Sequence, residues 1–167
     1  MVDNLPDSIK VGTITVAVGG ASIDLFDKRT CKAYLKKQPD WMKNFASQYN
    51  GNPYARLIEL AKIAQKQGVI KGILLHQGET NNGDANWPNR VKTVYNDILK
   101  ELNLKAENVP LLVGETVQQD QGGKCWQHIA IVDDIAKTIP TAHVISSKGC
   151  PQRGDGLHFI AESYRTM

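Results

Sequence analysis

The sequence predicts an α/β protein in which helices cover both faces of a parallel sheet. Two observations lead to this fold class. Short apolar runs typical of buried strands alternate with amphipathic patterns of helical period along the 167 residues. Each apolar run ends in glycine or polar residues, as is typical of the turn that follows a strand. Such an alternation of strands and helices is typical of parallel sheets with helical crossovers.

Four segments are predicted to be strands. In the first, residues 11–18, apolar side chains alternate until the chain reaches Gly19-Gly20. The other three are short apolar runs at residues 69–75, 109–113 and 142–146. Because function in such folds lies outside the carboxyl ends of the strands, we expect the polar residues that follow these strands to lie at one rim.

Helices are predicted between these strands. Asn52-Pro53 is typical of a helix start, and Gly68 is typical of its end. The predicted inward faces are Leu57, Leu60, Ala61 and Ala64 for this helix; Val91, Val94, Tyr95, Ile98, Leu99 and Leu102 for the next; and Ile129, Val132 and Ala136 for a helix over residues 124–138. Residues 24–50 are predicted to be a surface connection with short helical pieces, and residues 161–167 the start of a last helix.

The composition narrows the possible function classes. Twenty Lys and Arg against seventeen Asp and Glu give a net charge of +3. This excess is too small and too scattered to indicate a nucleic-acid or anionic-membrane partner. No apolar run approaches the roughly 18 residues of a transmembrane helix, and residues 1–6 lack the pattern of a signal peptide. No linker or repeat divides the chain, so residues 1–167 are predicted to form one domain.

The pair Asp155 and His158 is the first candidate for chemistry. The two residues are three apart on a glycine-containing loop before the last predicted helix. The carboxylate can then accept a hydrogen bond from one imidazole nitrogen and leave the other free as a base. The alternative is that Asp155 caps the helix and His158 is satisfied by the backbone.

Two further rim segments carry polar groups. His76-Gln77-Gly78-Glu79 follows a strand, so Gln77 could donate to an oxyanion and Glu79 could act as a base or an orienting acid. Gly19-Gly20-Ala21-Ser22 follows the first strand and offers backbone N–H groups to an anion. For both segments the alternative is an ordinary polar turn, and neither is a phosphate-binding loop.

The tryptophans and cysteines suggest fewer functional roles. Trp87 follows the Glu79 loop and is the best candidate to stack on a sugar ring, whereas Trp41 and Trp126 are expected to pack in the core. Cys125 and His128 have C-x-x-H spacing, but nothing nearby completes a metal site, so no metal is predicted. The cysteines, Cys31, Cys125 and Cys150, are expected to be free thiols, although one disulfide pair stays open.

Three segments in this order resemble the SGNH hydrolases: V-A-V-G-G-A-S-I, G-V-I-K-G-I-L-L-H-Q-G-E-T and G-D-G-L-H-F. More narrowly, they are similar to the group of sialate O-acetylesterases and acetylxylan esterases, family 6 of the carbohydrate esterases. The similarity runs from about residue 11 to residue 167.

The resemblance implies a three-layer α/β/α, flavodoxin-like fold and the removal of acetyl groups from sugars by serine acyl-enzyme chemistry without a metal or organic cofactor. It implies that His158 is the general base. Asp155 occupies the place of the acid that orients it, although Glu79 has also been proposed for that role in this group. The N–H groups near Gly19-Gly20 and the side chain of Gln77 would bind the oxyanion.

One part of the family pattern is missing. The nucleophilic serine lies in a G-Q-S-N-type block at the end of the family's first strand, and this sequence contains no such block. In the usual strand order, that strand lies between the segments 11–18 and 69–75. We therefore expect part of an acetylxylan- or sialate-type esterase, without its first strand and the end of its last helix, and inactive alone. A separate N-terminal segment or a second copy would complete the sheet.

The sequence leaves other hypotheses open for the nucleophile and for the function. A different residue could replace the missing nucleophile. Ser22 is the first candidate, and Ser146, Ser147 and Cys150 are the others. A different class is an inactive sugar-binding or interaction domain that retains the fold, with Trp87, Ser22 and the other rim residues binding the ligand. A third reading, a flavodoxin-like nucleotide or flavin binder, suits the element order but lacks a phosphate loop.

Overall fold

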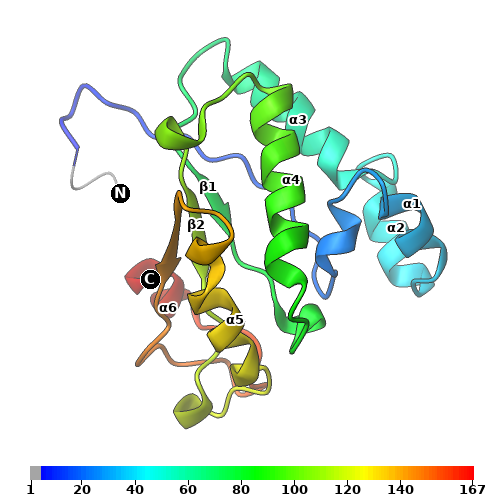
Figure 1. Ribbon diagram of the computed structural model, residues 1–167, viewed down its shortest axis with the longest axis vertical. Helices are drawn as coiled ribbons and strands as arrows, with labels where there is room; N and C mark the ends of the chain where they lie inside the picture. The colour runs from blue at the N-terminus through cyan, green and yellow to red at the C-terminus, as the bar shows by residue number, and fades with distance from the viewer. Residues whose placement is uncertain (1–4) are drawn as a thin grey trace.

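A computed structural model describes residues 5–167 and shows a small parallel sheet with helices around it (Figure 1). The strands are β1 (Ile73–Leu75), β2 (Leu111–Gly114) and β3 (Ala142–Ile145), in the spatial order β1-β2-β3. Both strand pairs are parallel, with Leu111 opposite Ile73 on one side and opposite Ala142 on the other. The predicted α/β class is confirmed.

Helices fill the connections between these strands. The α-helices are α1 (Cys31–Lys36), α2 (Asp40–Ser47), α3 (Pro53–Ala64), α4 (Trp87–Glu101), α5 (Ile129–Asp133) and α6 (Ala161–Thr166). The single-turn 3₁₀ helices are η2 (Ile23–Leu25), η3 (Glu79–Asn81), η4 (Ala106–Asn108), η5 (Gln119–Gln121), η6 (Trp126–His128) and η7 (Ile135–Lys137). The predicted connection with short helical pieces over residues 24–50 is thus confirmed.

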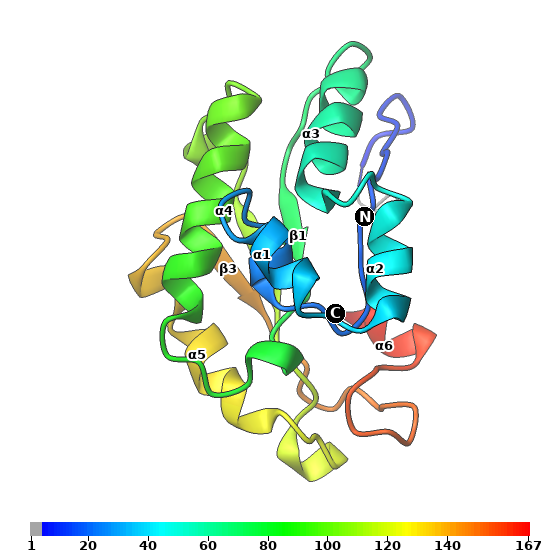
Figure 2. The ribbon, with the colours of Figure 1, turned by 90° about the vertical axis from the view of Figure 1, so that its right-hand side faces the viewer.

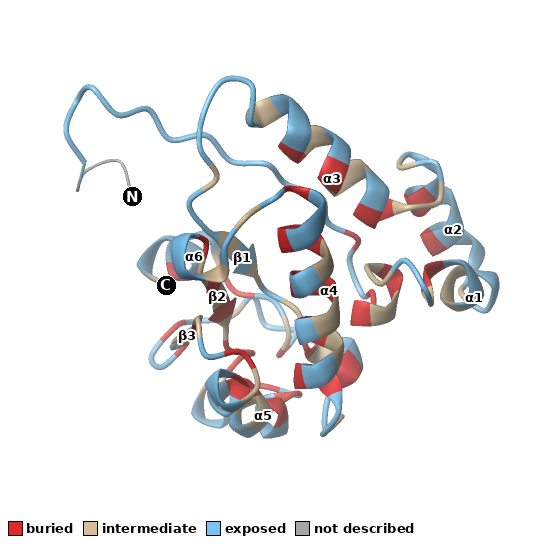
Figure 3. Cartoon of the chain, turned by 45° about the horizontal axis from the view of Figure 1, so that its top comes forward, coloured by how far each residue is buried: buried red, intermediate tan, exposed pale blue. Residues whose placement is uncertain are grey.

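The sheet lies between helical layers. Turned by 90°, the ribbon shows α4 and α5 on one side of the strands and α6 on the other (Figure 2). The main core joins α4 to the sheet through apolar residues such as Val91, Val94, Ile98, Leu111 and Val113, all of them buried. The apolar face predicted for the helix over residues 91–102 is therefore confirmed, and the buried side of α4 is visible in Figure 3.

The start of α3 follows from its sequence. The Asn52 side chain accepts a hydrogen bond from the N–H of Ala55 at 3.0 Å, and Pro53 occupies the first helical position. The buried face differs from the predicted one, because Tyr54, Ile58 and Ala61 are buried whereas Leu57, Leu60 and Ala64 are only half-buried.

The strand predicted over residues 11–18 is wrong. These residues run without assigned secondary structure and belong to no sheet, and only Val18 among them is buried. Val11 and Ile14 are exposed. Apolar alternation favours a strand only where a neighbour supplies the hydrogen bonds of a ladder, and no strand among residues 5–167 pairs with this segment.

The helix predicted over residues 124–138 is also wrong as one element. It consists of η6, α5 and η7 in succession. Because a 3₁₀ turn holds three residues instead of 3.6, the buried positions become His128, Val132 and Ile135, while Ala136 is exposed. Among residues 5–167, no helix is both long enough and apolar enough to cross a membrane.

Candidate active site

Asp155 and His158 form a closely contacting pair at the rim of the sheet. The Oδ2 atom of Asp155 lies 2.8 Å from Nδ1 of His158, and its Oδ1 atom accepts from the backbone N–H groups of His158 and Leu157, both at 2.8 Å. These hydrogen bonds hold the pKa of Asp155 well below its usual range. Because the ionised carboxylate only accepts, Nδ1 of His158 carries the proton and Nε2 is left as a base.

The loop around this pair is held in a hairpin-like shape. The N–H of Arg153 donates to the carbonyl of His158 at 2.8 Å, and Gln152 is bridged to Phe159. Gly156 lies close to the backbone of Gly122 with a φ of 74°. A Cβ atom there would lie 2.7 Å from the carbonyl oxygen of Gly122, so this position requires glycine.

Glu79 contacts a different histidine. Its Oε1 atom lies 3.6 Å from Nε2 of His76, and no ion pair among the described residues joins Glu79 to His158. The His76 ring packs against Phe159 and Tyr164, with ring centroids 5.7 and 5.6 Å away. Burial lowers the pKa of His76, and the negative charge of Glu79 opposes this shift. In this geometry Asp155 contacts His158 directly, whereas Glu79 contacts His76.

Gln77 was expected to donate to an oxyanion, and the structure places its amide elsewhere. Its Nε2 group donates to the carbonyl of Ala21 at 3.2 Å and to Oδ1 of Asn81 at 2.9 Å. Its Oε1 atom accepts from Nε1 of Trp87 at 2.6 Å. Both amide hydrogens are therefore used inside the protein, so Gln77 braces the loop and leaves no free donor.

Trp87 was expected to stack on a sugar, and this expectation is wrong. Its side chain is fully buried, at 0% exposure, as the first residue of α4. Its ring packs edge-on against His128 with centroids 4.8 Å apart. A buried ring has no free face for a ligand, so Trp87 is a core residue.

The Gly19-Gly20 turn retains free backbone donors. The hydroxyl of Thr80 donates to the carbonyl of Gly20 at 2.8 Å, which ties the turn to the loop after β1. Among residues 5–167, no group accepts from the N–H of Gly19 or Gly20, and both residues are exposed. The expected anion-binding role of this turn is compatible with that geometry.

Ser22 was expected to contact substrate or to replace the nucleophile, and the structure places it in a capping role. It is buried, and its Oγ atom accepts from the N–H of Asp24 at 3.2 Å as the cap of η2. Ser147 is likewise buried, with Oγ bonded to Glu115 and to the carbonyl of Thr116. No serine hydroxyl within residues 5–167 lies in hydrogen-bonding distance of His158.

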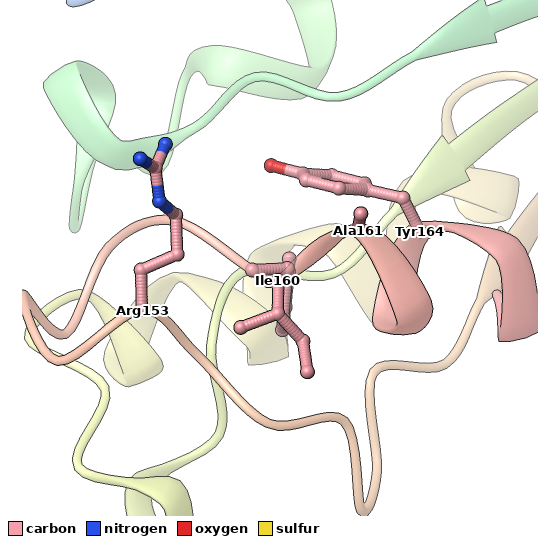
Figure 4. A pocket seen from close by; sticks show the side chains of 5 residues that line it. Arg153, Ile160, Ala161 and Tyr164 are labelled. Atoms are coloured by element: carbon pink, nitrogen blue, oxygen red, sulfur yellow. The ribbon is translucent and has the colours of Figure 1, made fainter.

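A hollow opens beside the His158 loop. It has a volume of about 440 Å³, and it is lined by Arg153, Phe159, Ile160, Ala161 and Tyr164. The guanidinium of Arg153 and the hydroxyl of Tyr164 stand on the same side, above Ile160 (Figure 4). Because Phe159 and Tyr164 also contact His76, the hollow adjoins both histidines of the rim.

Comparison with known proteins decides the family. The profile of a family described as carbohydrate esterase, sialic acid-specific acetylesterase, matches residues 1–167. The chain belongs to this family. A solved structure of a protein from Arabidopsis thaliana, determined at 1.6 Å, is similar with a TM-score of 0.54 and 23% sequence identity. The match covers 66% of this chain and 46% of that protein, so the chain spans about half of its length, and at this identity the likeness supports the fold.

Two buried residues of this candidate site, Asn81 and His128, were not expected from the sequence to have a structural role there. Oδ1 of the buried Asn81 accepts from the N–H of Ile23 at 3.0 Å, so it joins the turn after residue 18 to the loop after β1. His128 lies beneath Gly78, where a Cβ atom would be 2.8 Å from its Nε2. Burial lowers the pKa of His128. The polar run Thr80-Asn81, directly after the H-Q-G-E motif, was the available signal for the first of these contacts.

Metal and thiol groups contribute little to this site. Within the described residues, no group of three or more His, Cys, Asp or Glu side chains is placed to hold a metal ion. Cys31, Cys125 and Cys150 are free and buried.

Proposed function

We propose that this chain carries the base half of a carbohydrate O-acetylesterase of acetylxylan or sialate type. His158 is the general base, Asp155 orients it, and the nucleophilic serine comes from sequence outside residues 1–167. The observation that carries the proposal is the Asp155–His158 pair, in which Nδ1 is held by a 2.8 Å contact and Nε2 has no hydrogen-bond partner among residues 5–167. The family membership supports the reaction class.

The chemistry follows from this geometry. His158 Nε2 removes the proton from the serine hydroxyl as the serine attacks the acetyl carbonyl, and then returns it to the departing sugar oxygen. Water hydrolyses the acetyl-enzyme with the same base. The free N–H groups of Gly19 and Gly20 stabilise the tetrahedral oxyanion, while Gln77 holds their turn in place. The hollow beside His158 accommodates part of the acetylated sugar.

The serine would arrive on a strand between residues 11–18 and β1, from a separate N-terminal segment or a second copy of the chain. Two observations support this arrangement. The segment 11–18 belongs to no sheet, and Leu74 of the edge strand β1 is 61% exposed. An added strand would pair with the β1 edge and cover Leu74.

The experiment measures p-nitrophenyl acetate hydrolysis by the 167-residue chain, with a fluorophosphonate probe and peptide mapping. We expect neither turnover nor label. A labelled peptide within residues 1–167 would contradict the proposal, because it would identify a nucleophile in this chain.

A serine-containing longer form provides the second arm. There, His158→Ala is expected to lower turnover by roughly 10⁶-fold, as loss of a triad histidine does in subtilisin. The matched control is His143→Ala, which removes an exposed histidine of β3 and should retain parent activity. Near-parental turnover of His158→Ala would overturn the assignment of the base.

An inactive sugar-binding domain is the second candidate. One observation favours it, namely that no hydroxyl nucleophile contacts His158 among residues 5–167. It predicts ligand binding without ester turnover in every longer form of the chain, and measurable acetate release by such a form would exclude it.

A further inference from the structure

The flank of α2 presents two aromatic rings to solvent. Trp41 is 57% exposed and Phe45 is 40% exposed. They are four residues apart and so lie on the same flank of the helix. Met42 and Ala46 are buried on the adjacent flank, and Met42 packs in the core around Leu25. The rings are therefore a surface feature of a helix that is anchored elsewhere.

This flank reaches the turn that carries the candidate oxyanion donors. The Cη2 atom of Trp41 lies 3.6 Å from the position that a Cβ atom on Gly20 would occupy. At the other end of the helix, the hydroxyl of Tyr49 lies 3.4 Å from the carbonyl oxygen of Ala17, and the Tyr49 ring packs edge-on against Phe45 with centroids 6.1 Å apart. The aromatic residues thus follow the segment 17–20 and end at Gly20.

The chemistry of the flank is neutral. Asn44 and Gln48, each three residues after one of the rings, are exposed and carry amide groups. The two charged residues of α2, Asp40 and Lys43, pair with each other at 3.3 Å. Aromatic faces accept the C–H groups of a sugar ring, and amides donate to and accept from its hydroxyls. Aromatic surfaces with a few placed polar groups are typical of ligand sites.

We propose that Trp41 and Phe45 form a subsite for a neutral glycan chain, which runs from the acetyl-bearing sugar at Gly20 along α2. The proposal rests on the proposed function, because it takes the Gly19-Gly20 turn as the place where the ester is held. Trp41 stacks on the sugar nearest the turn, and Phe45 on a sugar farther along. The subsite therefore selects acetylated oligomers over single acetylated sugars.

The experiment uses the 167-residue chain and unacetylated xylohexaose as a ligand that cannot be hydrolysed. The three indole N–H signals in nitrogen-correlated NMR spectra report on Trp41, Trp87 and Trp126 separately. We expect xylohexaose to shift the Trp41 signal and to bind about tenfold more tightly than xylose. Trp87 serves as the internal reference, since its N–H is bonded to Gln77 in the core.

Two variants complete the design. Trp41→Ala is expected to weaken xylohexaose binding about tenfold, and the matched control Trp126→Ala, at a partly exposed tryptophan of η6, should bind like the parent. An unshifted Trp41 signal at millimolar xylohexaose, or unchanged affinity in Trp41→Ala, overturns the proposal. So does a loss of self-association in Trp41→Ala without a loss of sugar binding, because the flank would then be a protein interface.

The two proposals fail in different ways. If a serine-containing form hydrolyses p-nitrophenyl acetate while Trp41→Ala loses nothing on acetylated xylo-oligosaccharide, the subsite is wrong and the esterase stands. If xylohexaose shifts Trp41 but no form releases acetate, the esterase is wrong and the sugar site stands.

Discussion

At the scale of single residues, close packing explains the glycine of the H-Q-G-E motif. The φ of Gly78 is 162°, an extended value that other residues adopt, so its conformation does not require glycine. The requirement comes from His128, whose ring lies directly against the Cα of Gly78 and would meet any Cβ atom there. His128 is itself fully buried against Trp87 and has little room to move.

Gly78→Ala is therefore expected to destabilise the chain. Overpacking of this kind costs about 1–3 kcal/mol of unfolding free energy, and it should also displace Gln77 and Glu79. The measurement is urea denaturation followed by circular dichroism. Gly68→Ala is the matched control, because no atom of the described part of the chain lies within 4 Å of its Cβ position, and it should change stability by less than about 1 kcal/mol. Equal stability of the two variants would contradict this account of Gly78.

At the scale of elements, a buried carboxylate joins β2 to the chain that follows β3. Glu115 comes directly after β2 and accepts from the N–H of Ser147 at 2.7 Å and from the hydroxyls of Ser146 and Ser147 at 3.1 Å. Asp133, at the end of α5, lies beside it, and partial burial together with Glu115 raises the pKa of Asp133 to about 6. Two strands and one helix therefore meet at an acidic pair that leads toward the Asp155–His158 loop.

This pair predicts a pH dependence of stability. The pKa of Asp133 is raised in the folded protein, so folding favours its protonated form. This contribution to the free energy of unfolding is complete below the unfolded pKa of about 3.9 and is lost as pH rises through about 6. Asp133→Asn should remove the repulsion. Because much of Asp133 is exposed to solvent, screening reduces its repulsion with Glu115 to about 1 kcal/mol. We therefore expect the Tm of Asp133→Asn to be about 2–4 °C above that of the parent at pH 7.5.

Calorimetry at pH 5 and pH 7.5 checks this prediction, with Asp134→Asn as the neighbouring control. Asp134 is exposed and pairs with Lys137 at 2.7 Å, and its charge raises the pKa of Asp133 less than Glu115 does, so its replacement should raise Tm less than Asp133→Asn does. The acidic pair is ruled out as the cause if Asp133→Asn and the parent change equally between the two pH values.

At the scale of the whole molecule, the unpaired edge of β1 is the feature expected to control association between chains. β1 is paired on one side with β2, and Leu74 projects from it with 61% of its surface exposed. The extended segment 11–18 adds the exposed side chains of Val11 and Ile14. Unpaired edges with apolar side chains pair with other strands, so we expect the 167-residue chain to self-associate.

Leu74→Lys should weaken this association, because a charge on an edge strand opposes strand pairing. Sedimentation velocity over a concentration series measures the effect. Val69→Lys is the control, since Val69 is 79% exposed but lies outside the strand. A parent chain that stays monomeric, or a Val69→Lys variant that dissociates as much as Leu74→Lys, would contradict the role of the β1 edge.

The sequence by itself determined the elements whose patterns are local. The period of the apolar residues in α4, the Asn52-Pro53 start of α3 and the short apolar runs of the three strands all predicted structure correctly, because propensity and burial agree there. The spacing of Asp155 and His158 made their contact possible, and the structure shows that contact at 2.8 Å. The apolar alternation in residues 11–18 was as clear as these patterns, but the segment forms no strand.

Only the tertiary structure decided which groups stay free to act. Gln77 and Trp87 looked available in the sequence, but each satisfies the other's hydrogen bond inside the protein. Glu79 contacts His76 and Asp155 contacts His158, a choice that spacing left open. Trp41, assigned to the core, is exposed beside Gly20. The physical reason is shared: burial and hydrogen bonding depend on partners far away in the chain, and the sequence pattern around a residue does not contain them.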